Sequence, residues 1–480
     1  MPLKIINRPT PYATRWINRF QPATFLVLAL LNLVAFSSNS QQLHHLKLDS
    51  LLTSLATHDK LMSGSLTLSR DGQVVYRRAF GHQQLAPKTP ATPATRYRIG
   101  SATKMFTAVM IFQLIEEKRL TLATPLATFF PQLLNARIIT IDQLLSHRSG
   151  LYNFTEDTAW VASHMPAKTP AQMLQLIGRG MPEFAPGTKA AYNNSAYVLL
   201  GYIVERLTRL SYAQALQKRV LTRAGLVNTY CGGKINPHKQ EASSYSISPA
   251  GWQRDLETEM SIPGGAGVIV STPTDLTRFL EALFGGRLVS AASLKTMQTI
   301  RDGYGRGLFA RPFGARPGYG HTGGIDGFVT LTTYFPAEKL AVAFCSNGQN
   351  YSPHDVLLGA LSIYFGQPYR IPTFPASSFV PAAVDLERYA GTYASAQIPG
   401  LKITMTKSGT TLQSQATNQA PATLEAEGPG VFKFDQSGGN IRIEFDPARQ
   451  TNRTMRAGGK YGSAALLSKH RSIRAAVVSS

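Results

Sequence analysis

The sequence predicts an α/β (α+β) body followed by a small all-β domain. Two observations indicate the body: segments with strand character stand toward both ends of residues 41–370, and helical segments lie between them, so the sheet pairs distant parts of the chain. The third observation is a change of pattern near residue 386, after which short alternating segments are separated by Gly, Ser or Asp. A length of 480 residues suits two or three domains.

Hydrophobic periodicity predicts the individual elements. Apolar residues at helical spacing indicate helices, and β-forming runs bounded by turn residues indicate strands, including a hairpin closed by Asp71-Gly72. Thr140 and Gln143 form a capping box that opens one helix. The other expected helices are 43–59, 101–119, 195–207 and 274–283, and the expected strands are 63–70, 73–81, 327–334 and 340–345.

Composition sets the domain boundaries. A Pro- and Ser-rich stretch at 371–385 reads as a linker between a first domain at 41–370 and a β domain at 386–460. The last residues, 461–480, are basic and are expected to form a flexible tail.

Cysteine and histidine usage excludes several kinds of site. The only cysteines, Cys231 and Cys345, are too few for a disulfide scaffold or a cysteine-built zinc or iron–sulfur site. A Cys231–Cys345 disulfide stays open, although the apolar strand around Cys345 favours a buried free thiol. The histidines show no metal-ligand spacing, so we expect no metal and no cofactor.

The net charge of +22 is unevenly distributed. Four basic residues and no acid stand in the first twenty residues, and six more without an acid follow from Arg453 onward. The remaining +12 is dispersed without a basic helix or zinc-finger spacing, which argues against nucleic-acid binding. Such a surface favours weak attraction to anionic cell-envelope polymers.

Residues 1–40 predict a signal peptide or an N-terminal anchor. The apolar run Ala23–Phe36 follows a basic segment, is short for a membrane-spanning helix and is followed by small residues. We therefore expect an exported, periplasmic or extracellular protein, which contacts a membrane only if residues 23–36 are not removed.

Ser101 and Lys104 form the first chemical motif, S-x-x-K. Residues at i and i+3 share one face of a helix, so the lysine can reach the serine hydroxyl and activate it as a nucleophile. Taken alone, the motif occurs often by chance and is more typical of a serine cap followed by a solvated lysine.

Tyr192 and Asn194 form the second motif, Y-x-N, before an apolar helix. A tyrosine can exchange a proton and an asparagine amide can hold both a lysine and a substrate carbonyl. A buried aromatic residue beside an Asn cap is the alternative.

The third motif is His321-Thr322-Gly323-Gly324, just before a predicted strand. Glycines allow a substrate to lie close to a strand edge, and the N–H groups of Ser101 and Gly324 can form an oxyanion hole. The alternative for His321 is a turn histidine.

In this order and spacing, the motifs resemble the serine β-lactamase and penicillin-binding protein family, in its class C β-lactamase, D-alanyl-D-alanine carboxypeptidase and esterase branch. The resemblance extends from about Gly64 to Gly348 and includes YRIGSATKMFTA, LLSHRSGL and GHTGGIDGF. It implies a β-lactamase/transpeptidase-like domain with an antiparallel sheet flanked by helices. LERYAGTY, from Leu386, resembles the lipocalin-like β domains of some D-aminopeptidase-like members.

The resemblance also implies residue roles. Ser101 becomes acylated, and Lys104 and Tyr192 share the base and acid steps, with the first base left open. His321 stands where typical class C β-lactamases have lysine, so recognition of an anionic substrate end should be weaker and more pH-dependent. His147 is expected to fix a loop. The expected substrate-binding residues are Asn194, His321, Thr322 and Gly323, and the oxyanion hole is formed by Ser101 and Gly324.

We therefore expect a serine hydrolase that acts through a Ser101 acyl-enzyme on an amide or ester bond. Its partner is a small-molecule or peptide substrate: a D-amino-acid peptide, a β-lactam or a small ester. The alternative is a penicillin-binding-type sensor protein that is acylated with negligible turnover.

Overall fold

The structure is a computed structural model that describes most of the chain after residue 41. The leader predicted at 1–40, with its apolar run, lies outside the described residues, as does 375–382 of the predicted linker. The described residues are 42–58, 60–156, 165–248, 251–374, 383–395, 402–409, 411–416, 422–434, 441–445, 454–458 and 465–469.

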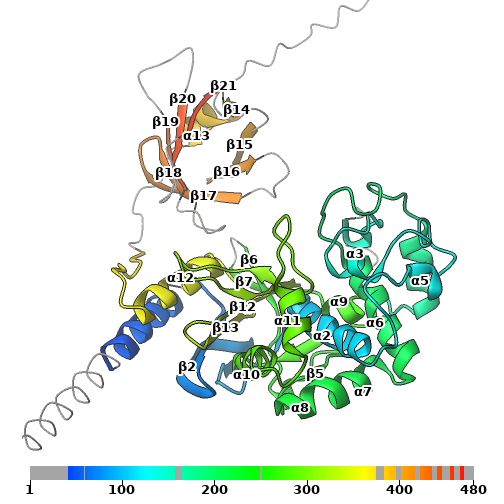
Figure 1. Ribbon diagram of the computed structural model, residues 1–480. Coiled ribbons are helices and arrows are strands. Elements are labelled where there is room, and N and C mark those ends of the chain that lie inside the picture. The colour runs from blue at the N-terminus through cyan, green and yellow to red at the C-terminus, as the bar shows by residue number, and fades with distance from the viewer. Residues whose placement is uncertain are drawn as a thin grey trace, which may run out of the picture. The chain divides into compact units, whose positions relative to one another are not determined.

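An antiparallel sheet organises the first domain, in the order β3-β2-β1-β13-β12-β10-β9, with β11 also paired to β12 (Figure 1). β1 pairs with β13, so that Leu66 lies opposite Phe344, which confirms that the sheet joins distant parts of the chain. The strands are β1 (Ser63–Arg70), β2 (Gln73–Leu85), β3 (Lys88–Pro90), β9 (Phe309–Ala310), β10 (Tyr319–Gly320), β11 (Thr322–Ile325), β12 (Phe328–Phe335) and β13 (Leu340–Ser346).

The predicted hairpin and capping box are both present. Asp71 and Gly72 have φ values of 52° and 83°, the left-handed backbone that a tight two-residue hairpin turn requires. The Thr140 hydroxyl accepts a hydrogen bond from the Gln143 N–H, and the Gln143 side chain accepts one from the Thr140 N–H. Both features could be predicted from the sequence because the residues that form each of them lie within three positions of one another in the chain.

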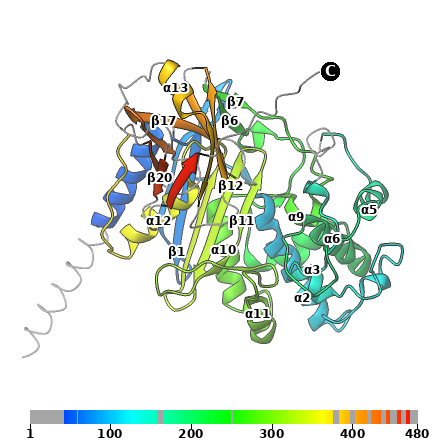
Figure 2. The ribbon, with the colours of Figure 1, turned by 90° about the horizontal axis from the view of Figure 1, so that it is seen from above.

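The helix after Ser101 is more deeply buried than its pattern predicts. Helix α2 (Thr103–Glu116) follows a short 3₁₀ turn, Gly100–Ala102, and is buried on every side from Thr103 to Leu114. The Phe106 ring stacks on Phe279 of α10 (Pro273–Phe284) with 3.8 Å between centroids. The sequence predicted one apolar face, but other helices and the sheet enclose α2, as Figure 2 shows, with α12 (Pro353–Tyr364) on the opposite side of the sheet.

The remaining described elements of the first domain are further helices and two small sheets. The helices are 42–57, α3 (Ile141–Leu145), α5 (Pro170–Gly178), α6 (Asn194–Thr208), α7 (Tyr212–Leu216), α8 (Thr222–Ala224), α9 (Gly264–Gly267), α10 (Pro273–Phe284), α11 (Ala291–Gln298) and α12 (Pro353–Tyr364). The small sheets consist of β4 (Tyr97–Arg98), β8 (Ile269–Ser271) and β5 (Tyr230–Cys231), and of β6 (Tyr245–Ser248) and β7 (Gly251–Arg254).

The C-terminal domain is a closed antiparallel barrel of strands β14 to β21, preceded by α13 (Ala383–Tyr389). Its interior is filled by a separate apolar cluster that includes Tyr393 and Phe432. The strands are β14 (Gly391–Ser395), β15 (Lys402–Ser408), β16 (Thr411–Ala416), β17 (Ala422–Gly428), β18 (Val431–Phe434), β19 (Ile441–Phe445), β20 (Thr454–Gly458) and β21 (Ala465–Lys469).

Two predicted boundaries of this domain need correction. β21 lies within the range 461–480 predicted as a flexible tail, yet it pairs with both β14 and β20 and thereby closes the barrel. α13 begins inside the predicted linker 371–385. The basic residues around β21 concealed a strand of which one partner, β14, is distant in the chain.

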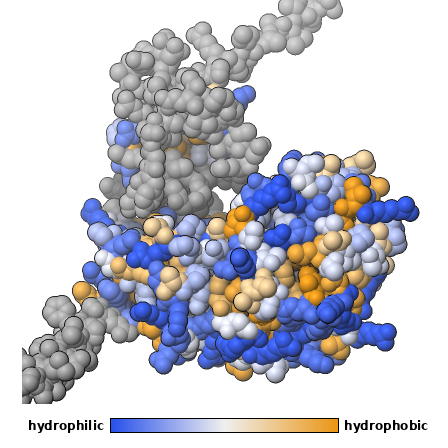
Figure 3. Space-filling view, viewed as in Figure 1, coloured by the Kyte–Doolittle hydropathy of each residue, from blue (hydrophilic) through white to orange (hydrophobic). Residues whose placement is uncertain are grey.

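The surface of the first domain is consistent with the dispersed charge that the sequence predicts. In Figure 3, hydrophilic residues are spread over its visible face, with smaller apolar areas between them. Within the described ranges, no helix has both the length and the hydrophobicity needed to span a bilayer.

Candidate active site

Ser101 lies in the tight turn that leads into α2. Gly100 has φ +49°, and a Cβ atom there would lie 2.7 Å from the Gly324 carbonyl oxygen, so this approach to β11 requires glycine. Lys104 follows on the same face, and its Nζ lies 3.0 Å from Ser101 Oγ. The S-x-x-K motif therefore forms the predicted contact.

Lys104 is completely buried, with 0% exposure, and no carboxylate pairs with it among the described residues. Its Nζ donates hydrogen bonds to Asn194 Oδ1 at 2.7 Å and to the Ala266 carbonyl oxygen at 3.0 Å. Burial holds the pKa of Lys104 well below its ordinary value of 10.5, because desolvation disfavours the charged form.

These contacts orient the neutral form of the amine. A neutral amine has two N–H groups and one lone pair, and the carbonyl oxygens of Asn194 and Ala266 can only accept hydrogen bonds. With both N–H groups directed at them, the lone pair faces Ser101 Oγ. Lys104 is therefore arranged to take a proton from the serine hydroxyl.

The Y-x-N segment supplies both a cap and a functional amide. Asn193 is the N-cap of α6, and its side chain accepts a hydrogen bond from the Ala196 N–H at 2.8 Å. Asn194, besides accepting from Lys104, donates through Nδ2 to Thr155 Oγ1 at 2.9 Å. The cap interpretation is therefore right for Asn193, while Asn194 faces the lysine.

Tyr192 lies beside the same lysine. Its ring centroid is 4.8 Å from Lys104 Nζ, and its hydroxyl is shielded from solvent. Burial raises the pKa of Tyr192 above 10, and the interaction of its hydroxyl with that of Ser101 acts in the opposite direction. The phenol is therefore protonated at neutral pH and can donate a proton.

His147 positions this loop, as the sequence predicted. Its Nδ1 accepts a hydrogen bond from the Asn193 N–H at 3.1 Å, and its ring lies 4.5 Å from that of Tyr192. Burial lowers the pKa of His147 well below 6.5, so the ring is neutral and its Nδ1 stays available as an acceptor.

His321 of the third motif is buried, with 1% exposure. Its ring stacks on Phe309 at 4.1 Å, and its Nδ1 is hydrogen-bonded to the Thr322 carbonyl oxygen. Nε2 is buried and has no partner among the described residues. Burial lowers the pKa of His321 to about 3, so the ring is uncharged at neutral pH.

The two glycines of the motif have different environments. A Cβ atom on Gly323 would lie 1.9 Å from the Ile99 carbonyl oxygen, whereas one on Gly324 would meet only the Phe328 oxygen at 4.0 Å. Gly323 thus allows β11 to lie against the turn before α2, which brings the Ser101 and Gly324 backbones together. Gly324 is exposed at this edge.

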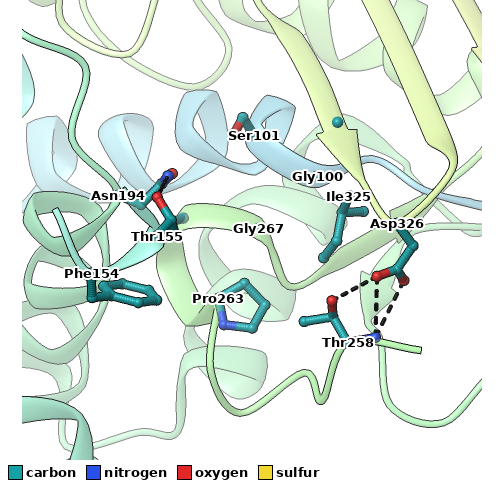
Figure 4. Close-up of a pocket in the computed structure, with 12 residues that line it drawn as sticks. Gly100, Ser101, Phe154, Thr155, Asn194, Thr258, Pro263, Gly267, Ile325 and Asp326 are labelled. Atoms are coloured by element: carbon teal, nitrogen blue, oxygen red, sulfur yellow. Dashed lines mark hydrogen bonds between the residues drawn. The ribbon is translucent and has the colours of Figure 1, made fainter. Parts of the chain in front are cut away.

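A pocket of about 200 Å³ opens beside Ser101 (Figure 4). Its lining includes no lysine, arginine or histidine, and Phe154, Pro263 and Ile325 supply apolar walls. Tyr192 and His321 are not part of it. The lining residues are Gly100, Ser101, Phe154, Thr155, Asn194, Thr258, Pro263, Ala266, Gly267, Gly324, Ile325 and Asp326.

A buried ion pair that the sequence analysis missed fixes one wall of the pocket. Arg98 Nη1 lies 3.0 Å from Asp326 Oδ2, and these side chains are 2% and 3% exposed. Thr258 Oγ1 donates to Asp326 Oδ1 at 2.6 Å (Figure 4), and Glu257 lies 3.3 Å from Arg98. Three distant segments meet here, which no local motif reveals.

The two cysteines are both free thiols, and Cys345 is buried in β13. The interpretation of Cys345 as a buried free thiol is confirmed, and the disulfide left open by the sequence is not formed.

With this geometry in place, comparison with known proteins decides the family. A model of the family described as Beta-lactamase matches residues 48–361. The chain belongs to the β-lactamase family. It is a serine hydrolase of that family, with the β-lactamase/transpeptidase-like fold that the motifs predicted.

Several members of the β-lactamase family resemble the chain. Penicillin-binding protein 4* of Bacillus subtilis is 25% identical over 82% of this chain and 88% of its own. A teichoic acid D-alanine hydrolase of Staphylococcus aureus is 24% identical over 65% of this chain and 76% of its own. The structure of a D-amino acid amidase from Ochrobactrum anthropi complexed with D-phenylalanine has a TM-score of 0.60 at 25% identity, and the match covers 66% of this chain and 99% of that one.

Proposed function

We propose that this chain is an exported serine hydrolase that cleaves an amide or ester bond of a D-amino-acid derivative through a Ser101 acyl-enzyme. The observation that carries the proposal is the position of Lys104. Its buried amine contacts Ser101 Oγ while two carbonyl oxygens occupy its other hydrogen-bonding directions.

In the acylation step, Lys104 Nζ takes the Ser101 hydroxyl proton as Oγ attacks the substrate carbonyl carbon. Negative charge develops on the carbonyl oxygen, which the N–H groups of Ser101 and Gly324 bind. The bond between carbon and the leaving nitrogen or oxygen then breaks. Tyr192 supplies the proton to the leaving atom and regains one from Lys104.

Deacylation repeats the same chemistry with water. Lys104 Nζ accepts a proton from water as its oxygen attacks the acyl carbon, and it passes this proton to Ser101 Oγ as the ester bond breaks. Ser101 recovers its proton and the acid product leaves. The net reaction consumes one water molecule and restores every side chain.

The pocket supports a compact acyl group. About 200 Å³ exceeds the roughly 150 Å³ cavity that admits benzene, so a phenylalanine-sized side chain can enter between the apolar walls. Two relatives are a D-amino acid amidase and a teichoic acid D-alanine hydrolase, and both names contain a D-amino acid. We therefore favour D-aminoacyl substrates over β-lactams and over esters that lack an amino acid.

The test is capture of the acyl-enzyme on Ser101. Purified protein is mixed with D-phenylalaninamide and with a chromogenic ester, and product release and intact mass are followed together. Wild type should turn over and show the acyl mass transiently, and Ser101→Ala should do neither. Ser246→Ala, which removes an exposed serine hydroxyl from β6, is the matched control and should behave as wild type.

Two other outcomes of that assay have definite meanings. Undiminished turnover by Ser101→Ala contradicts the proposal. A stable adduct without product indicates the penicillin-binding-type sensor instead of a hydrolase.

Export is a separate part of the proposal, supported by the basic and apolar character of residues 1–40. N-terminal sequencing of protein recovered from the expressing cell's envelope and medium tests it. A mature chain that begins after Phe36 indicates a cleaved signal. An intact chain in the membrane fraction indicates an anchor, and an intact chain in the cytoplasm contradicts export.

A further inference from the structure

Thr155 lines the pocket beside Asn194 and takes no part in the catalytic steps proposed above. It lies in the short 3₁₀ turn Phe154–Glu156. Its Oγ1 accepts a hydrogen bond from Asn194 Nδ2 at 2.9 Å and donates one to Asn153 Oδ1 at 3.0 Å, and Figure 4 shows the Thr155 side chain directed at Asn194. The hydroxyl thus connects the amide that contacts Lys104 to a second side-chain amide.

The orientation of the Asn194 amide decides what Lys104 can do. Rotation of the amide by 180° exchanges its oxygen and its nitrogen with almost no change in shape. With Oδ1 toward Lys104 Nζ, as in the structure at 2.7 Å, the amide accepts an N–H of the amine. With Nδ2 in that place, the amide would donate to the lone pair of the amine. That lone pair would then no longer be available to Ser101.

Lys104 cannot fix this orientation itself while it is neutral. A neutral amine has N–H groups and a lone pair, so it can pair with either end of an amide. The other two partners of Nζ are Ser101 Oγ and the Ala266 carbonyl oxygen. Among the described residues, the side chain that contacts the far end of the Asn194 amide is Thr155.

Asn153 fixes the direction of the hydrogen bonds of Thr155. Asn153 Oδ1 accepts from the backbone N–H of Asn194 at 3.1 Å, a group that can only donate, and Asn153 Nδ2 donates to Glu156 Oε1 at 2.8 Å. The Thr155 hydroxyl therefore gives its one hydrogen to Asn153 Oδ1 and can only accept from Asn194. Nδ2 of Asn194 fills that position, which leaves Oδ1 for Lys104.

Building on the proposed acyl-enzyme function, we infer that Thr155 is a positioning residue: its hydroxyl holds the Asn194 amide with Oδ1 toward Lys104, and this leaves the lysine lone pair directed at Ser101.

The titratable groups around Lys104 stay the same when the threonine is replaced. The rings of Tyr192 and Tyr197 lie 4.8 and 5.5 Å from Lys104 Nζ, and His147 and His321 interact with its charge. Burial lowers the pKa of both histidines and raises the pKa of both tyrosines, so all four are uncharged near neutral pH. A changed pH dependence in such a variant therefore reports on Lys104.

Thr155→Val tests the inference, because valine has nearly the same shape as threonine but no hydroxyl. Steady-state hydrolysis of D-phenylalaninamide and the pre-steady-state acylation rate with a chromogenic ester are measured between pH 4 and 10 on the full-length protein. We expect kcat to fall about 10- to 100-fold and KM to change less than about threefold, because fewer molecules have the lone pair directed at Ser101. An unchanged kcat overturns the inference.

The pH profile distinguishes positioning from a merely structural role. A carbonyl oxygen next to the amine favours charged Lys104, so its replacement by Nδ2 should lower the pKa of Lys104 further and move the rising limb to lower pH. Loosened packing would instead admit water around the amine, raise the pKa of Lys104 toward 10.5 and move the limb to higher pH. A limb that moves up or stays in place in Thr155→Val overturns the inference.

Three further variants complete the series. Thr155→Ser keeps the hydroxyl and should retain kcat within about threefold of wild type, and equal impairment by serine and valine overturns the inference. Thr155→Cys carries a weak acceptor in the same place and should fall between the two, so it tests the inference even if the valine variant does not fold. Thr299→Val removes an exposed hydroxyl that is bonded to the Lys295 carbonyl oxygen, and this control should behave as wild type.

The same measurements separate this inference from the proposed function. If wild type is not acylated on Ser101, the proposed function fails and this inference fails with it. If wild type is acylated and Thr155→Val keeps the wild-type rate and pH profile, the proposed function stands and only the role of Thr155 fails.

Discussion

The pocket beside Ser101 and the ring cluster of Tyr192, Phe309 and His321 contrast in how they are built. The pocket is open and has apolar walls from Phe154, Pro263 and Ile325, so it can discriminate between ligands by volume. The ring cluster lies outside the pocket, and its packed rings fix the position of Tyr192 beside Lys104. One region is therefore built to admit a ligand and the other to hold a side chain in place.

Lys104 contacts both Ser101 and the ring of Tyr192, so its removal should have the largest effect. Lys104→Met keeps a long apolar stem but removes the base, and we expect the acylation rate to fall about 10³- to 10⁴-fold. Stopped-flow measurement of the acylation burst checks this loss. Lys189→Met, at an exposed lysine, is the control. A decrease of the acylation rate by less than about tenfold would show that Lys104 is not the main base for Ser101.

Adjacent glycines sharpen the contrast at the strand edge. Gly323→Ala should force β11 away from Ile99 and lower kcat about 100-fold, since the oxyanion-binding backbone shifts. Gly324→Ala has open space and should change kcat/KM less than about threefold. Steady-state kinetics and thermal melts of the two variants provide the comparison. The reverse order of effects contradicts the placement of β11.

Loss of the buried Arg98–Asp326 ion pair should loosen only the pocket beside Ser101. Asp326→Asn leaves Arg98 with Glu257 as its one remaining carboxylate partner, and breaking such a pair costs about 3–5 kcal/mol. We expect a lower Tm and a KM raised about tenfold with kcat nearly kept, because Lys104 is untouched. Arg254→Gln, at the exposed Arg254–Glu257 pair, should cost less than about 1 kcal/mol. A fall in kcat with constant KM would place Asp326 in the chemistry instead.

Local signals in the sequence predicted much of this site. The Asp71-Gly72 turn, the Thr140 capping box and the Ser101–Lys104 spacing are each closed within a few residues, so the chain itself encodes their geometry. The order and spacing of the three motifs then predicted that Tyr192, Asn194 and His321 belong to the same active site as Ser101. The loop role of His147 was also predicted, although its partner, the Asn193 N–H, is visible only in the structure.

Features that depend on distant partners were not predictable. The hydrogen bonds of Asp326 to Arg98 and Thr258 join three segments that are distant in the chain. No sequence motif within any one of these segments indicates the contact. The protonation state of His321 depends on its burial and on the hydrogen bond between its Nδ1 and Thr322. The residue type alone therefore predicted pH-dependent recognition of an anionic substrate end, by a histidine that could become charged. β21 was missed because only pairing with β14 and β20 stabilises it.

The central claim is that neutral Lys104, and not Tyr192, takes the serine proton. Its lowered pKa means that the neutral fraction grows as pH rises from acid, while Tyr192 stays protonated until above pH 10. The direct test is the pre-steady-state acylation rate between pH 4 and 10 in wild type and Tyr192→Phe. We predict a rising limb well below pH 10.5 in both proteins, with a plateau about 100-fold lower in the variant. A limb that vanishes in Tyr192→Phe, or that lies near 10 in wild type, would contradict it.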